Sequence, residues 1–160
     1  MSETVERGAM DAQAAEEIRR HHAGMVEDAD RLSAALVEAA ESGADAEPAR
    51  SALLEWITTV LVPHAAQEEE TTYPAAAGLP EGHLLIMGML AEHDLIRHLA
   101  GLVRGTKNPA AAGAYARALF ETFASHQRKE NDYILPLLVH EPSISLTELM
   151  SASHSHGHHH

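Results

Sequence analysis

The sequence predicts an all-α protein, an antiparallel up-down-up-down four-helix bundle. Apolar side chains recur every three or four residues along four long stretches, which is the pattern of helices that face one another. Alanine is abundant, aromatic residues make up only 4% of the chain, and no long stretch alternates polar and apolar residues as a strand would. Short segments containing glycine or proline separate the stretches, so we expect successive helices to be antiparallel neighbours.

We expect the first two helices over residues 10–42 and 48–76. The buried stripe of the first is expected at Ile18, His22, Met25, Ala29, Leu32, Leu36 and Ala39. That of the second is expected at Leu54, Ile57, Leu61, His64 and Glu68. Pro63 lies inside the second helix. Because proline lacks an N–H and its ring crowds the preceding turn, we expect a kink or a loosened turn just before His64.

The third and fourth helices are expected over residues 82–104 and 110–139. Their stripes are Ile86, Met89, His93, Ile96, Ala100 and Val103, and Ala116, Leu119, Phe123, His126, Glu130, Tyr133 and Leu137. Residues 145–150 can form one more short helix. The His-rich tail that follows is expected to be disordered, and is either native or an expression remnant. We therefore divide the chain into a bundle, residues 1–142, and a short helix with its tail, residues 143–160.

Length and composition exclude several classes of protein. A chain of 160 residues, 45% of them hydrophobic, suits one domain with a single core. A formal net charge of −13 argues against nucleic acid or an anionic membrane as a partner. The absence of cysteine rules out thiolate catalysis, disulfides and sulfur-ligated metals. With no secretory leader and no apolar run of about 20 residues, we expect a cytoplasmic protein.

One pattern occurs twice: a histidine, a glutamate four residues later and a proline ten residues after the histidine. The two copies are His64, Glu68 and Pro74, and His126, Glu130 and Pro136. Residues four apart lie on one face of a helix, so each copy directs an imidazole and a carboxylate toward one target. Such a pair of side chains suits a metal ion.

Two further histidines, His22 and His93, lie on the stripes of the first and third helices. At 1.5 Å per residue, all these side chains fall within about two helical turns of one another, in one layer of the core. Any one histidine could be an ordinary core residue. Six ionisable groups in one buried layer would be costly without a cation, and no basic residue on the stripes neutralises the carboxylates. We predict a metal centre formed by His22, His64, Glu68, His93, His126 and Glu130.

The number of ligands indicates two metal ions. Two six-coordinate ions need about twelve donor positions. Four imidazoles, two bridging carboxylates and one bridging oxygen leave roughly two positions for an outside ligand, whereas a single zinc needs only four ligands. Two iron ions with an oxo or hydroxo bridge are the first choice, and manganese or mixed occupancy is the alternative.

The order of these residues resembles the hemerythrin-like, HHE cation-binding family: a lone histidine, His-x-x-x-Glu followed by Tyr-Pro, a Glu-His pair, and a second His-x-x-x-Glu. The resemblance covers residues from about Glu17 to Leu138. It implies an antiparallel four-helix bundle with a non-haem di-iron centre whose ligands are the same six side chains. Ferritin-like di-iron bundles use Glu-x-x-His pairs, and no Glu of this chain is followed by His three residues later.

The chain departs from oxygen-carrying hemerythrins on the third helix. They have a second histidine four residues after the first, where this chain has Arg97. His98 is about 140° around the helix from His93 and is a poor substitute. His21 and His83 also lie off the stripes. A missing imidazole would leave an open or water-filled position on one iron, which argues against reversible oxygen carriage and favours turnover of oxygen, peroxide or nitric oxide.

Several residues near the expected ligands have two interpretations. The hydroxyl of Tyr133, one turn beyond Glu130, could hydrogen-bond a ligand or take part in redox chemistry, with a core aromatic as the alternative. Tyr73 and Trp56 are interpreted as packing residues. Three glutamates either orient the histidines or form solvated helix surface: Glu17, Glu69 and Glu92. The second copy of the repeat has Asn131 where the first has Glu69.

Two classes of function remain open. The first is a di-iron enzyme with peroxidase-like, catalase-like or nitric oxide-consuming activity, since open coordination positions suit small oxidants. The second is a protein that binds or senses oxygen, nitric oxide or iron without forming a product. Both have a small molecule as partner, and neither determines the oligomeric state.

Overall fold

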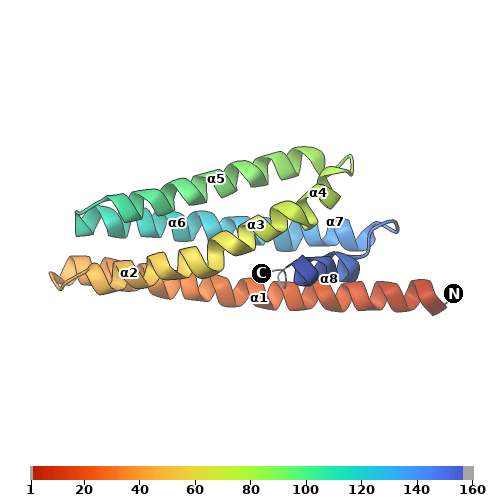
Figure 1. Ribbon diagram of the computed structural model, residues 1–160, viewed down its shortest axis with the longest axis horizontal. Coiled ribbons are helices and arrows are strands. Elements are labelled where there is room, and N and C mark those ends of the chain that lie inside the picture. The colour runs from red at the N-terminus through yellow and green to blue at the C-terminus, as the bar shows by residue number, and fades with distance from the viewer. Residues whose placement is uncertain (1, 157–160) are drawn as a thin grey trace.

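The chain is all-helical in the computed structural model, which describes residues 2–156 and, of these, the side chains of residues 3–152. The elements are α1 (Ser2–Ser42), α2 (Glu47–Trp56), η1 (Ile57–Leu61), α3 (Val62–Glu70), α4 (Thr72–Ala77), α5 (His83–Gly105), α6 (Pro109–Lys129), η2 (Glu130–Ile134), α7 (Leu135–His140) and α8 (Leu146–His156). Figure 1 shows α1 along the whole molecule, α2 returning beside it, α3 and α4 crossing from α2 toward the start of α5, and α5 lying beside α6 and α7. The predicted all-α class is confirmed.

Two of the expected helices contain a π-helical turn that ends two residues before a proline. In η1 the N–H of Val62 bonds the carbonyl of Ile57, and in η2 the N–H of Leu135 bonds that of Glu130. The residue that follows each of these donors is a proline, Pro63 or Pro136, which has no N–H to continue the ladder. The loosened turn expected before His64 is therefore η1, and the second motif has its own counterpart.

The wider turn of η2 changes which side chains of the fourth helix face the core. A π-helix has more residues per turn than an α-helix, so the buried stripe continues from Glu130 to Ile134 and then to Leu138. The side chains of Ile134 and Leu138 are 2% and 0% exposed, whereas that of Tyr133 is 60% exposed. The expectation that Tyr133 lies on the buried stripe is wrong for this reason.

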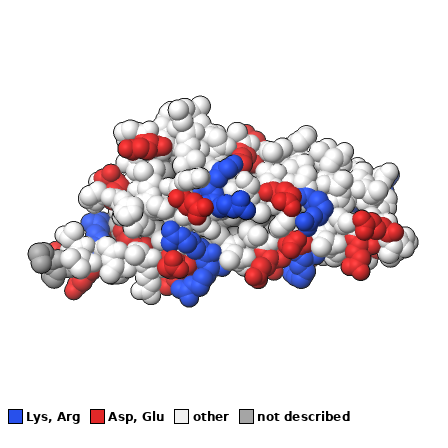
Figure 2. All heavy atoms as spheres, turned by 180° about the vertical axis from the view of Figure 1, so that it is seen from behind, with Lys and Arg blue, Asp and Glu red and all other residues white. Residues whose placement is uncertain are grey.

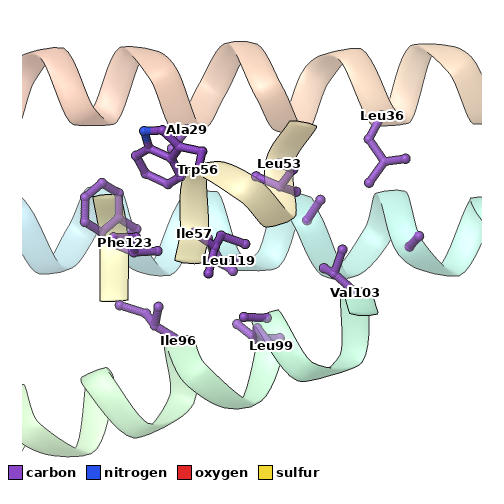
Figure 3. Close-up of a cluster of buried hydrophobic side chains, with 14 of the residues drawn as sticks. Ala29, Leu36, Leu53, Trp56, Ile57, Ile96, Leu99, Val103, Leu119 and Phe123 are labelled. Carbon is purple, nitrogen blue, oxygen red and sulfur yellow. The ribbon is translucent and has the colours of Figure 1, made fainter. Parts of the chain in front are cut away.

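Two hydrophobic clusters make up the core, one on each side of the predicted site layer. The first contains Trp56 and Phe123, whose rings meet edge to face at 6.0 Å, together with Leu36, Ile57, Leu119 and other side chains (Figure 3). The second contains Ile86, Met89, Ile134, Leu135, Leu138 and Leu146. Trp56 is a packing residue, as interpreted from the sequence. The site layer thus lies between two hydrophobic clusters.

The last helix, α8, is longer than expected and packs on α1 (Figure 1). Its first turn is held by Asp11 of α1, whose carboxylate accepts hydrogen bonds from the Thr147 N–H at 3.0 Å and the Thr147 hydroxyl at 2.7 Å. Leu146, at 0% exposed, belongs to the second hydrophobic cluster. Residues 151–156 of the tail expected to be disordered belong to α8, and residues 157–160 lie outside the part of the chain that the structure describes.

Charges on the face shown in Figure 2 are mixed, with basic side chains lying next to acidic ones. Among the described residues, no helix is long and apolar enough to cross a membrane.

Candidate metal centre

The six predicted ligand side chains come together from five elements: α1, α3, α5, α6 and η2. Their donor atoms form two groups, in each of which all the atoms lie within 4.8 Å of one another. The first group, which we call group A, is His22, His64, Glu68 and Glu130. The second, group B, is Glu68, His93, His126 and Glu130. Both glutamates belong to both groups, so the layer has two adjacent places for a cation.

Three of the four histidines are held by a hydrogen bond on the side that faces away from the groups. The pairs are His22 Nδ1 with Asn131 Oδ1 at 2.8 Å, His93 Nδ1 with Glu69 Oε1 at 3.0 Å, and His126 Nδ1 with Glu92 Oε1 at 3.1 Å. Because a carbonyl or carboxylate oxygen only accepts, each Nδ1 is the donor, and each Nε2 directs its lone pair toward the centre. Of the two interpretations of Glu69 and Glu92, the orienting one applies; Glu17 is exposed.

Two basic side chains in turn hold the carboxylates of Glu69 and Glu92. Arg97 donates to Glu69 Oε1 at 2.8 Å, and Lys129 donates to Glu92 Oε2 at 2.7 Å. Arg97 therefore supports His93 through Glu69. It stands where oxygen-carrying hemerythrins would have a histidine, but its guanidinium is turned to the rim of the site.

The two shared carboxylates titrate as an interacting pair. Burial and the negative charge of Glu130 raise the pKa of Glu68 well above its ordinary value. Burial also acts to raise the pKa of Glu130, but its interactions with the neighbouring His126 and Glu68 side chains outweigh this effect and leave that pKa below its ordinary value. Burial lowers the pKa of His22 and His64, which favours neutral imidazoles. Neutral imidazole is the form that binds a metal ion.

Three donor atoms of the layer are buried without a hydrogen-bond partner: His64 Nε2, Glu68 Oε1 and Glu130 Oε2. Buried polar atoms in native proteins are nearly always paired, so such a set in one place requires an explanation. Cations bound at the two groups would pair all three. The residues present therefore fit a metal centre.

Tyr73 is a residue of the site that sequence reasoning missed. It is 1% exposed, and its hydroxyl contacts Glu130, His126 and His93. Burial and the charges of Glu130 and Glu68 raise the pKa of Tyr73 above its ordinary value. An unbroken helix from His64 would not place Tyr73 on the stripe. The break at Thr71, with φ −120° and ψ −83°, restarts the helix and turns the ring inward. Only the Tyr-Pro pair of the family pattern could have indicated it.

A large cavity opens onto one side of the layer. A cavity of about 520 Å³ reaches His22, His64, Glu68 and Glu130 of group A, and neither His93 nor His126 lines it. Its other walls come from α1, α4, α7 and α8, with Ile18, Leu135 and Met150 among them. Beside Arg97 the gap next to His93 and His126 is about 10 Å³, room for about one water. The wide access is therefore on the side of His22 and His64, away from the missing third-helix imidazole.

The remaining histidines lie outside the two groups. His21 is exposed and lines the cavity, with its ring 5.5 Å from that of His64. His83 and His98 are exposed on α5. None of the three contributes to the buried layer, as expected from their places off the stripes.

The fold and this layer together define a helical protein with a buried cluster of histidines and carboxylates that could bind metal. A family model, the hemerythrin HHE cation binding domain, matches residues 13–138, and the chain belongs to this family. No curated protein and no solved structure matches the chain significantly.

Proposed function

We propose that the protein is a non-haem di-iron protein. The ligands in this proposal are His22, His64, Glu68, His93, His126 and Glu130, with an oxo or hydroxo bridge between the irons. The observation that carries it is that Glu68 and Glu130 belong to both groups of donor atoms, because a carboxylate shared by two sites can bridge two ions. The all-nitrogen and oxygen donor set favours iron, with manganese as the alternative.

We further propose that this centre reacts with a small oxidant: hydrogen peroxide, oxygen or nitric oxide. Bound iron would supply the electrons and the open coordination positions for such chemistry. The protein would give the oxidant access to the centre and limit the access of water. The cavity ends at His22 and His64, and apolar side chains from α1, α7 and α8 line its walls. Neutral His22 and His64 would keep the end of this route free of positive charge before metal binds.

Steady-state consumption of hydrogen peroxide, and separately of nitric oxide, by the iron-loaded protein tests this proposal. We expect turnover that is lost in His64→Ala and retained in His98→Ala, an exposed histidine outside both groups. Negligible turnover together with a stable spectrum of an oxygen adduct would instead support the non-enzymatic alternative, a binding or sensing protein.

A further inference from the structure

The hydroxyl of Tyr73 lies among the donor atoms of group B. Its oxygen is 2.8 Å from His126 Nε2, 3.2 Å from His93 Nε2 and 2.5 Å from Glu130 Oε1. The exposed fraction of each of these four side chains is 2% or less, so bulk water does not compete for the contacts. The phenol oxygen therefore meets the three side chains that, with Glu68, make up group B.

A single hydroxyl proton cannot satisfy all three contacts. His93 and His126 donate their Nδ1 protons to Glu69 and Glu92, so in the neutral rings each Nε2 carries a lone pair. The O–H of Tyr73 bonds Glu130, and its oxygen lone pairs then face the two Nε2 atoms. Lone pairs converging at hydrogen-bond distance in a buried site repel, and a cation among these atoms removes the repulsion.

The distances agree with those between neighbouring ligands of one ion. Ligands at about 2.1 Å from a six-coordinate ion lie about 3 Å from their neighbours in the shell. The three contacts of Tyr73 Oη scatter around this value, as does the 3.1 Å between His126 Nε2 and Glu130 Oε1. A hydroxyl that served only packing would not need three donor atoms of the same cation site around it.

We propose that the phenol oxygen of Tyr73 is a further ligand of the metal ion at His93 and His126. This proposal rests on the proposed function, in which that ion is iron. On binding, an oxygen–metal bond replaces the O–H bond, the proton leaves to bulk water, and no electron is transferred. The ion at group B then has a protein ligand that the ion at group A lacks. An outside ligand is directed to the ion at His22 and His64, where the large cavity ends.

A tyrosinate bound to iron(III) absorbs visible light by charge transfer, and resonance Raman spectra excited in that band contain the ring vibrations of tyrosine. We expect both signals in the full chain loaded with iron(III). They should be lost in Tyr73→Phe, a change that keeps the ring stacked on His93, at 5.0 Å between ring centres and 17° between planes, and removes only the oxygen. Ring-deuterated tyrosine should shift the vibrations in the native protein.

The chain has three tyrosines, Tyr73, Tyr115 and Tyr133, so a double variant provides a control that leaves Tyr73 intact. Tyr115→Phe with Tyr133→Phe should keep the full signal, which also tests the assignment if Tyr73→Phe fails to fold. Iron content is measured in the same samples. Full iron content in the native protein without tyrosine vibrations, or vibrations that are lost in the double variant, would overturn the assignment of Tyr73 alone. Native protein that binds no iron would overturn the proposed function.

Discussion

Glu69 accepts a hydrogen bond from the Nδ1–H of His93, across the interface between α3 and α5. Asn131, at the same place in the second copy of the repeated motif, accepts from Nδ1 of His22 on α1. Each copy therefore supplies a histidine and a glutamate to the layer, and the next residue holds the lone histidine of another helix. The repeat has Glu69 in one copy and Asn131 in the other. Both residues nevertheless serve the same purpose, because each has a side-chain oxygen that accepts a hydrogen bond from a histidine Nδ1–H.

Glu69→Ala should weaken metal binding without removing a ligand. Loss of its carboxylate frees the His93 ring to rotate and leaves Arg97 without its partner. Partners of this kind typically contribute about 10- to 100-fold to metal affinity. Competition with a chelator of known affinity measures the change. Glu70→Ala, at the exposed neighbouring position, should bind as the native protein does, and equal weakening in both variants would contradict the orienting role of Glu69.

Asp11 should make the attachment of α8 dependent on pH. Burial raises the pKa of Asp11, but hydrogen bonds from Thr147, Leu146 and Ser145 outweigh it and leave the pKa below its ordinary value. A carboxyl whose pKa is lower in the folded state stabilises the fold above its unfolded pKa, about 3.9, and loses that contribution as the pH falls through the folded pKa. Helix-capping interactions of this kind contribute about 1 kcal/mol.

Asp11→Ala should therefore lower the stability at neutral pH by about this amount and remove the corresponding acid-dependent part of the unfolding curve. Chemical denaturation of both proteins between neutral pH and pH 3 measures it. Asp28→Ala, an i,i+3 partner of Arg31 on the same helix, serves as a control with little effect on stability. Parallel stability curves for the native protein and Asp11→Ala across this range would contradict the assignment.

Gly82 is required by the close approach of α4 to the start of α5. A Cβ at this position would lie 1.9 Å from the carbonyl oxygen of Ala76 and 3.1 Å from Leu137 Cδ2. Because the nearest atom is backbone, Gly82→Ala must displace one of the two helices. We expect a loss of about 1–3 kcal/mol or more in the free energy of unfolding.

Gly88→Ala is the matched control, since a Cβ there meets no atom within 4 Å in the interior of α5. Alanine is the better helix former, so this variant should gain about 0.5–1 kcal/mol. Thermal or urea unfolding of the two variants gives the sign of each effect. A neutral Gly82→Ala would mean that the approach of α4 to α5 is looser than described.

The sequence predicted the all-α fold and the meeting of the six histidines and glutamates, because helical periodicity carries across each long segment. It failed where that periodicity is interrupted. The π-helical turn at Glu130–Ile134 displaces Tyr133 to the surface, and the break at Thr71 brings Tyr73 into the site. Proline indicates such an irregularity but does not determine the direction in which later side chains point.

The position of the access route also could not be predicted. Arg97 indicated a missing imidazole and hence an open or water-filled position on one iron, but not the side from which the layer is accessible. The large cavity instead depends on how α8 packs on α1, which is set by Asp11 and Thr147, far from the motif in sequence. Ligand motifs predict what a site contains, and contacts between distant segments determine which side of it is open.

Metal content tests the central claim most directly. In protein lacking residues 154–160, so that the His-rich tail cannot contribute, we predict two iron ions per chain. His64→Ala and His126→Ala should each reduce this number, and His83→Ala and His98→Ala, which lie outside both groups, should leave it unchanged. Undiminished iron in both His64→Ala and His126→Ala, with folded protein confirmed by circular dichroism, would contradict the account.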